Sequence, residues 1–269
     1  MNKRLSSSID GLFLYLRINM TLGICKLCGE EKELQRSHVI GKTFFSSILR
    51  DSHNNVATQF EFKNNTVKET NDTWYTRLLC SHCERFFNEE YENYSTAALR
   101  RKRKEIEINE KTNGVAFKNV NVEKIVLFIF SIYWRASHSD HEAFAECITF
   151  PELDNVLIGI LKKKIKIDPH LLKVRIRLLK DSTKFFDEVL IKQIIISPFI
   201  KELSKGFMYT MVVEGYLFEI YFTTINFKFS NKLGFLVNKN ETYIPYVEIF
   251  SHKDIRENLF IGVKNIKSH

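Results

Sequence analysis

The sequence predicts an α+β protein with a small zinc-bound N-terminal domain, a helical middle and an antiparallel, β-rich C-terminal domain. Three observations lead to this fold class. Two Cys-x-x-Cys pairs lie in the first third of the chain. A nearly continuous apolar run at 121–137 is typical of a buried helix. Alternating apolar residues after Pro169 are typical of strands.

The composition indicates a globular protein that is large enough to bury a sizeable core. The 269 residues are 44% hydrophobic and 27% charged, and only 4 are proline, so any domain boundary falls in a short loop. We therefore expect an N-terminal extension (1–21), a zinc-binding domain (22–110) and an α+β domain (111–269), with helices in 121–165 and strands in 170–250.

The four cysteines of the two pairs are the strongest signal in the chain. Cys25 and Cys28 form the first pair, and Cys80 and Cys83 form the second. Two such pairs can place four thiolates around one Zn²⁺. A site closed by four protein ligands is structural, because it leaves no position for water. Reduced core cysteines, a redox pair or disulfides are the alternatives.

Residues beside these cysteines suggest where chemistry could occur. His38 follows the first pair in an apolar-flanked stretch that is typical of a strand, and a helix is expected from Glu84 onward. A strand histidine facing a helix N-terminus is a compact site for a phosphate and a hard cation. The alternative is a hydrogen-bonded core histidine with no chemical role. We expect His53 and His82 to be exposed, although His82 could replace one cysteine as a ligand.

The chain contains three motifs in this order: Cys-x-x-Cys, then Ser-His-Val-Ile, then Leu-Leu-Cys-x-x-Cys-Glu. In these motifs it resembles the HNH endonucleases that have a zinc-supported ββα-metal, or treble-clef, domain. The resemblance covers about residues 22–95 and implies that His38 is the general base that activates water. It implies that Glu84 and Asn88, one helical turn apart, hold a catalytic Mg²⁺ or Mn²⁺. The sequence departs from the family at Ser37, where Asp or His is usual, and it has no helical histidine.

Positive charge is concentrated in two places. The run Arg100, Arg101, Lys102, Arg103 and Lys104 ends the zinc-binding domain, and residues 162–205 contain 12 basic and 5 acidic residues. Two basic surfaces beside a neutral domain favour a polyanionic partner, and we expect nucleic acid, DNA in particular. A solvated helix face would also carry such charge.

The remaining elements follow in chain order. A loop or loose hairpin is expected at 50–76, a helix from Glu84 to about 99, a strand at 104–108 and a turn at 113–114. Beyond the helix at 121–137, we expect one helix after Ser139–Glu142 and another from Pro151. Strands are expected near 174–178, 191–199, 207–213, 216–223 and 243–250, followed by a short helix at 251–259. The arginines at 175 and 177 are expected on an open sheet face that could bind nucleic acid.

These patterns lead to one main hypothesis and two alternatives. The main hypothesis is an HNH-type endonuclease that hydrolyses phosphodiester bonds in DNA, and the resemblance implies a role such as bacterial or phage defence. A non-catalytic zinc-stabilised nucleic-acid-binding module and a protein-interaction adaptor remain open. The apolar stretch at 12–18 is too short for a membrane helix and lacks a cleavage site, so we expect a cytoplasmic protein with no membrane partner. Its oligomeric state is left open.

Overall fold

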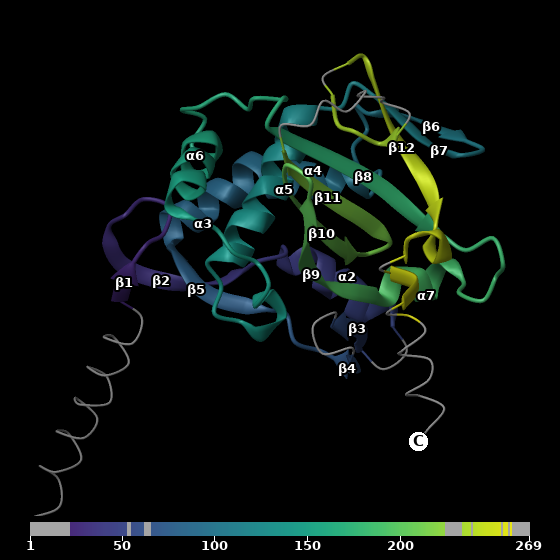
Figure 1. Ribbon diagram of the computed structural model, residues 1–269, viewed down its shortest axis with the longest axis horizontal. Helices are drawn as coiled ribbons and strands as arrows, with labels where there is room; N and C mark the ends of the chain where they lie inside the picture. Colours follow the sequence, from purple (N-terminus) through teal and green to yellow (C-terminus); the bar gives the residue numbers. More distant parts are fainter. Residues whose placement is uncertain are drawn as a thin grey trace, which may run out of the picture.

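The computed structural model describes residues 22–52, 55–61, 66–223, 233–237, 239–253, 255–257 and 259. The predicted extension 1–21 and His53 lie outside these residues. The described chain forms two sheets with helices between them (Figure 1). The small sheet has the order β1 (Leu22–Ile24), β2 (Glu31–His38), β5 (Tyr75–Cys80).

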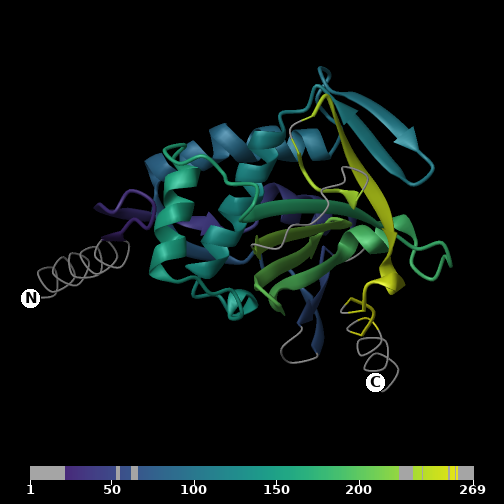
Figure 2. The ribbon, with the colours of Figure 1, turned by 45° about the horizontal axis from the view of Figure 1, so that its top comes forward.

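The large sheet has nine strands in the order β4-β3-β9-β10-β11-β8-β12-β7-β6. Their bounds are β3 Ala57–Glu61, β4 Thr66–Thr70, β6 Glu107–Lys111, β7 Gly114–Lys118, β8 Leu172–Lys180, β9 Ile194–Leu203, β10 Gly206–Val213, β11 Tyr216–Thr223 and β12 Glu241–Glu248. The protein is therefore a mixed α+β structure with a large mixed sheet. Figure 2 shows the β6–β7 and β3–β4 hairpins projecting from it.

The helices lie mainly between the two sheets. They are α2 (Lys42–Asp51), α3 (Ser81–Phe87), a π-helical turn (Asn88–Glu92), α4 (Asn93–Leu99), α5 (Val122–Ser137), α6 (Pro151–Leu161) and α7 (Glu188–Gln193), with 3₁₀ turns at Glu142–Phe144 and Ile249–Ser251. α3, the π turn and α4 are continuous, so one long helix follows the second cysteine pair. No helix among the described residues is long and apolar enough to cross a membrane.

Helix α5 is the centre of the core, as its sequence predicts. Thirteen of its sixteen residues are buried, and the Asn121 side chain caps its first turn by accepting from the Lys124 N–H at 3.0 Å. One cluster of buried side chains extends from Cys25 through α5 to Ile244 in β12. The small sheet and the large sheet therefore share a core.

Local sequence explains several element boundaries. Pro151 begins α6 at the first helical position, where its missing N–H costs nothing. Strands β10 and β11 join through Glu214 and Gly215, whose φ angles of 50° and 75° give the left-handed turn that tight hairpins favour. Both features agree with the sequence-based prediction.

The C-terminal sheet differs from the antiparallel sheet that we predicted. β3 pairs in parallel with β9, and β12 pairs in parallel with β8. The sheet also recruits β3 and β4 from the predicted 22–110 domain, and the predicted boundary after residue 110 falls inside β6. Alternation predicts that a segment is a strand, but it does not specify its partner or direction.

Two further expectations were wrong. Helix α7 occupies part of the predicted strand 191–199, because the Asp187 side chain caps it by accepting from the Leu190 N–H at 2.8 Å. Arg175 and Arg177 do not line an open face. Both pair with Glu219 of β11, whose side chain is fully buried, at 2.6 and 3.0 Å. Their guanidinium groups are therefore committed within the protein.

Candidate metal centre and the neighbouring polar site

Four cysteine side chains converge beside the small sheet. Cys25 follows β1, Cys28 lies in the turn toward β2, Cys80 ends β5 and Cys83 lies in the first turn of α3. Their sulfur atoms all lie within 4.8 Å of one another. A tetrahedral zinc with Zn–S bonds of about 2.3 Å needs sulfurs about 3.8 Å apart. The cysteine cluster could therefore hold a metal ion such as zinc.

The backbone around the cysteine cluster favours a thiolate. Burial alone would raise the pKa of the Cys25 thiol, but N–H groups of Cys28, Cys80 and Leu27 outweigh burial and lower this pKa to about 7. Burial, together with the neighbouring sulfurs, raises the pKa of the Cys83 thiol. Four thiols this close cannot all ionise without a cation, and a bound metal ion would supply that positive charge.

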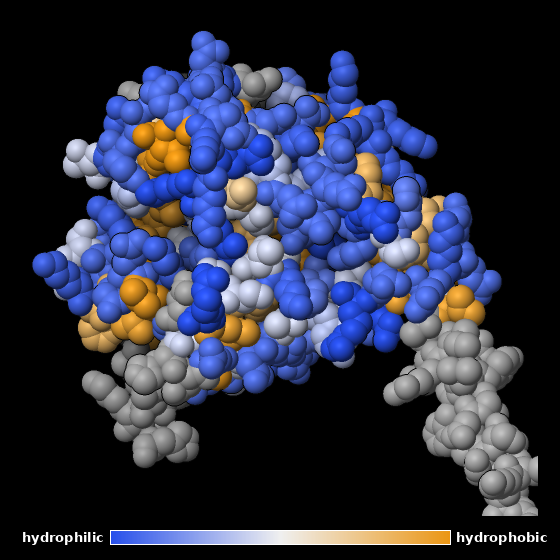
Figure 3. Space-filling view, turned by 180° about the vertical axis from the view of Figure 1, so that it is seen from behind, coloured by the Kyte–Doolittle hydropathy of each residue, from blue (hydrophilic) through white to orange (hydrophobic). Residues whose placement is uncertain are grey.

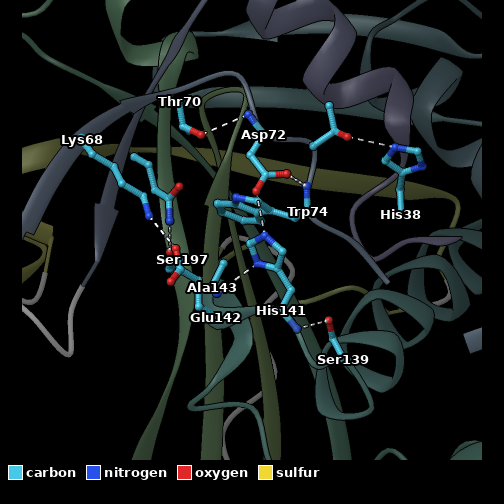
Figure 4. Close-up of polar contacts among 12 residues, drawn as sticks. His38, Lys68, Thr70, Asp72, Trp74, Ser139, His141, Glu142, Ala143 and Ser197 are labelled. Carbon is cyan, nitrogen blue, oxygen red and sulfur yellow. Dashed lines mark hydrogen bonds and ion pairs between the residues drawn. The ribbon is translucent and has the colours of Figure 1, made fainter. Parts of the chain in front are cut away.

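His38 lies at the end of β2 and is half-buried. Its Nε2 lies 3.1 Å from the Thr73 hydroxyl, and its carbonyl accepts from Arg135 Nη1 at 2.6 Å. Burial lowers the pKa of His38, and the nearby Lys42 and Arg135 lower it further. The imidazole is therefore neutral at pH 7. Figure 4 shows it hydrogen-bonded at one side of a larger polar group that contains Asp72 and His141.

Glu84 is held by the residue that precedes His38. The buried Ser37 hydroxyl donates to Glu84 Oε2 at 2.8 Å. Neighbouring strand residues point to opposite faces, so the Ser37 side chain and the His38 imidazole leave β2 on opposite sides. The expected arrangement, with His38 and Glu84 facing one gap, is not what the structure contains.

Glu84 and Asn88 do share a surface depression of about 640 Å³. Arg36, Arg77 and Arg85 line the same depression, whereas His38 does not. Two carboxylates, of Glu33 and Glu84, are outnumbered in this depression by three guanidinium groups, which repel a divalent cation such as Mg²⁺ or Mn²⁺. Among the described residues, the cysteine cluster is the one grouping of three or more His, Cys, Asp or Glu side chains placed to share an ion.

Two residues next to this site were not identified from the sequence. Arg135 of α5 is 1% exposed, and its Nη2 lies 3.7 Å from Glu92 Oε2. Burial raises the pKa of Glu92, while Arg135 lowers it. Glu92 also packs against Gly41, where an added Cβ would lie 2.1 Å from its Oε1. The sequence did contain one signal for this pair, namely Arg135 within an apolar helical stretch. A guanidinium buried there requires a partner that compensates its charge.

The outer face of the small sheet carries a second group of polar residues. The antiparallel register places Arg36 opposite Arg77 and His38 opposite Tyr75. The Arg36 guanidinium lies 3.7 Å from the centre of the Tyr75 ring, which is 40% exposed. We call Arg36, His38, Tyr75 and Arg77 the outer face. It combines cations, an aromatic ring and an imidazole on two neighbouring strands.

Two further histidines, His138 and His141, have carboxylate partners. His141 Nε2 lies 2.8 Å from Asp72, and its Nδ1 accepts from the Ala143 N–H at 3.1 Å (Figure 4). Both ring nitrogens are therefore engaged. His138 pairs with Asp154 at 2.8 Å. His82 is exposed, as predicted, and stands outside the cysteine cluster.

The basic run after α4 is only partly available to a ligand. Arg100 pairs with Glu214 at 3.0 Å, Arg101 pairs with Glu110, and Arg103 pairs with Glu105. Lys102 and Lys104 are exposed and have no ion-pair partner among the described residues. The three arginines of the run are therefore engaged within the protein, whereas the sequence-based hypothesis assigned all five residues to a polyanionic partner.

Comparison with known proteins adds no assignment. No family model matches the chain, and neither a curated protein nor a solved structure matches it.

Proposed function

We propose that the protein binds nucleic acid through the outer face, and that a structural zinc ion in the cysteine cluster holds this face in place. The observation that carries the proposal is the register of β2 and β5, which places Arg36 and Arg77 side by side with Tyr75 and His38 next to them. Arginines bind phosphate oxygens, and an adjacent aromatic ring and imidazole are common partners for nucleotides. Arg85 borders the depression beside this face.

The zinc ion has a mechanical role in this proposal. Cys25 and Cys28 precede β2, Cys80 ends β5, and Cys83 begins the helix behind them. One ion therefore fixes both strands of the outer face and the helix that packs against them. Loss of the ion should therefore loosen the pairing of β2 with β5, which holds Arg36 beside Arg77.

The test is binding of a labelled 20-base-pair DNA and of a single strand, measured by fluorescence anisotropy between 50 and 200 mM salt. Arg36→Ala and Arg77→Ala should each weaken binding roughly tenfold and lower the log–log salt slope by about 1. Lys239→Ala removes an exposed cation elsewhere and is the matched control. Binding that is insensitive to Arg36 and Arg77, or equally sensitive to Lys239, would refute the proposal.

A second candidate is phosphodiester cleavage by an HNH-type endonuclease, which rests on the sequence resemblance and on one observation. His38 is neutral, lies on the outer face and has its backbone carbonyl fixed by Arg135, so a base is present where phosphate would bind. The donor set at Glu84 and Asn88 argues against a resident catalytic cation there. We therefore place this candidate second.

Plasmid cleavage with added Mg²⁺ or Mn²⁺ tests the second candidate. If His38 is the base, His38→Gln should lower the cleavage rate by at least about 100-fold, while zinc content and DNA affinity stay unchanged. Equal cleavage by the variant removes His38 from the mechanism. Absence of cleavage with every ion tested, together with intact DNA binding, leaves the binding function alone.

The surface gives less support to a protein-interaction adaptor. Among the large exposed apolar side chains, Ile148 and Phe150 border a hollow of about 340 Å³, and Phe185 belongs to a different segment. The face in Figure 3 is mostly hydrophilic, with separate hydrophobic patches. Scattered apolar residues are ordinary on a protein surface and do not define a docking site.

A further inference from the structure

A cavity of about 930 Å³ lies away from the outer face, between α2, the end of α4, α7 and the turn that joins β10 to β11. Seven basic and five acidic side chains line it. The two basic regions of the sequence meet here. Arg100, Arg101 and Lys102 come from the first region, and Lys180, Lys184 and Lys192 come from the second. Tertiary folding thus joins charges that lie about 80–90 positions apart in the chain.

The five acidic residues of the cavity are all engaged locally. Asp181 accepts from the Thr183 and Phe186 N–H groups at 2.8 and 2.9 Å. Asp187 caps α7. The three glutamates pair with basic neighbours, namely Glu110 with Arg101, Glu188 with Lys192 and Glu214 with Arg100. Three of the five carboxylates are therefore paired with cations, while Asp181 and Asp187 accept hydrogen bonds from neutral groups and keep their charge.

Two lysines of the cavity remain without a counter-ion. Neither Lys102 nor Lys184 has an ion-pair partner among the described residues, although both line the cavity. Lys180 pairs at 3.1 Å with Glu248, which is not a lining residue. With seven basic and five acidic side chains, the lining of the cavity has an excess of positive charge, and a concave wall strengthens the field that such charge produces.

We propose that this cavity binds a small phosphorylated molecule with two or more phosphate groups, such as a nucleoside triphosphate. Its volume lies within the range of small-molecule sites, which is about 300–1,000 Å³. Lys102 and Lys184 come from different segments and can each bind a phosphate group, while Tyr246 and Phe186 supply rings at the wall. The proposal is independent of DNA binding at the outer face, because none of the outer-face residues lines this cavity.

Isothermal titration of the full-length protein with ATP, adenosine and inorganic tripolyphosphate tests the proposal. ATP and tripolyphosphate should bind at one site per chain, whereas adenosine should bind much more weakly. Lys102→Ala and Lys184→Ala should each weaken binding about tenfold, as expected for one charge-assisted contact. Lys104→Ala, an exposed lysine of the same run that does not line the cavity, should change it less than twofold.

Three results would overturn the proposal. They are no binding of either phosphate compound, equal loss with Lys104→Ala, and displacement of ATP by a 20-nucleotide DNA that lacks terminal phosphates. The last result would make the cavity part of a nucleic-acid surface. Arg36→Ala is the cross-check, because it should weaken DNA binding and leave ATP binding unchanged. Failure at the cavity is therefore distinguishable from failure of the outer face.

Discussion

The two sheets of this protein are stabilised in different ways. In β11, a central strand of the large sheet, all eight residues are buried, while in β2 of the small sheet only Ser37 is buried. One face of β11, including Phe218 and Ile220, packs into the core with α5, and the other face carries Leu217 and Glu219. The centre of the large sheet is therefore covered on both sides by protein.

The difference indicates what each sheet can do. A strand that is buried on both faces is held by apolar contacts, which are insensitive to ions and leave no room for a ligand. A mostly exposed strand such as β2 needs another constraint, and the cysteine cluster supplies it at the end of the small sheet where β1 and β5 end and β2 begins. The small sheet can therefore present polar side chains to solvent. Four predictions test this contrast.

The largest effect is expected from removing a cysteine ligand. Cys80→Ser should abolish stoichiometric zinc binding and lower Tm by roughly 10 °C, because several kcal/mol of metal-binding free energy stabilise the fold. Zinc content by mass spectrometry and a thermal scan measure both effects. Cys147→Ser is the control, since Cys147 is equally buried but lies outside the cysteine cluster. If Cys80→Ser kept its zinc and its Tm, the claim that a metal ion stabilises the small sheet would be wrong.

The next largest effect concerns the buried charges of the large sheet. Glu219→Gln should reduce the free energy of unfolding by about 3–5 kcal/mol, because Arg175 and Arg177 would lose their shared carboxylate in a buried position. Urea denaturation measures the change. Glu188→Gln removes an exposed glutamate from a pair with Lys192 and should cost at most about 0.5 kcal/mol. Zinc content should not change in either variant.

Arg135 connects the two regions, and its loss should have an intermediate effect. Arg135→Met should cost about 3 kcal/mol, because the Glu92 carboxylate would lose its partner and the His38 carbonyl its donor. Adding Glu92→Gln should recover part of this loss in a double-mutant cycle. If the two changes were simply additive, the contact between Arg135 and Glu92 would have no energetic role.

The smallest effect is the pH dependence due to His38. Its pKa is lowered from 6.5 in the folded state, so between the folded value and 6.5 the unfolded chain binds more protons. The contribution of His38 to the free energy of unfolding is therefore fully present above pH 6.5. It decreases as the pH falls below 6.5. Urea midpoints at pH 7.5 and 5.5 should differ more for the native protein than for His38→Gln. An identical pH response would show that the imidazole is not constrained.

The sequence-based predictions were best where the relevant interactions are local. The helices at α5 and α6, the β10–β11 hairpin and the four convergent cysteines were all expected, because capping residues, turn residues and ligand spacing act over a few positions. The π-helical turn at 88–92 had no signal. It inserts one residue into a helical pattern that otherwise looked regular.

The amino-acid sequence alone thus determined the segments of this protein and a cysteine cluster suited to a metal. The tertiary structure decided which segments became partners. It placed β3 and β4 on the large sheet, turned Ser37 toward Glu84 and His38 away from it, paired Arg175 with Glu219, and gathered two basic regions around one cavity. The physical reason is that local preferences are short-ranged, whereas charge pairing and strand partnership depend on residues brought together only by the complete fold.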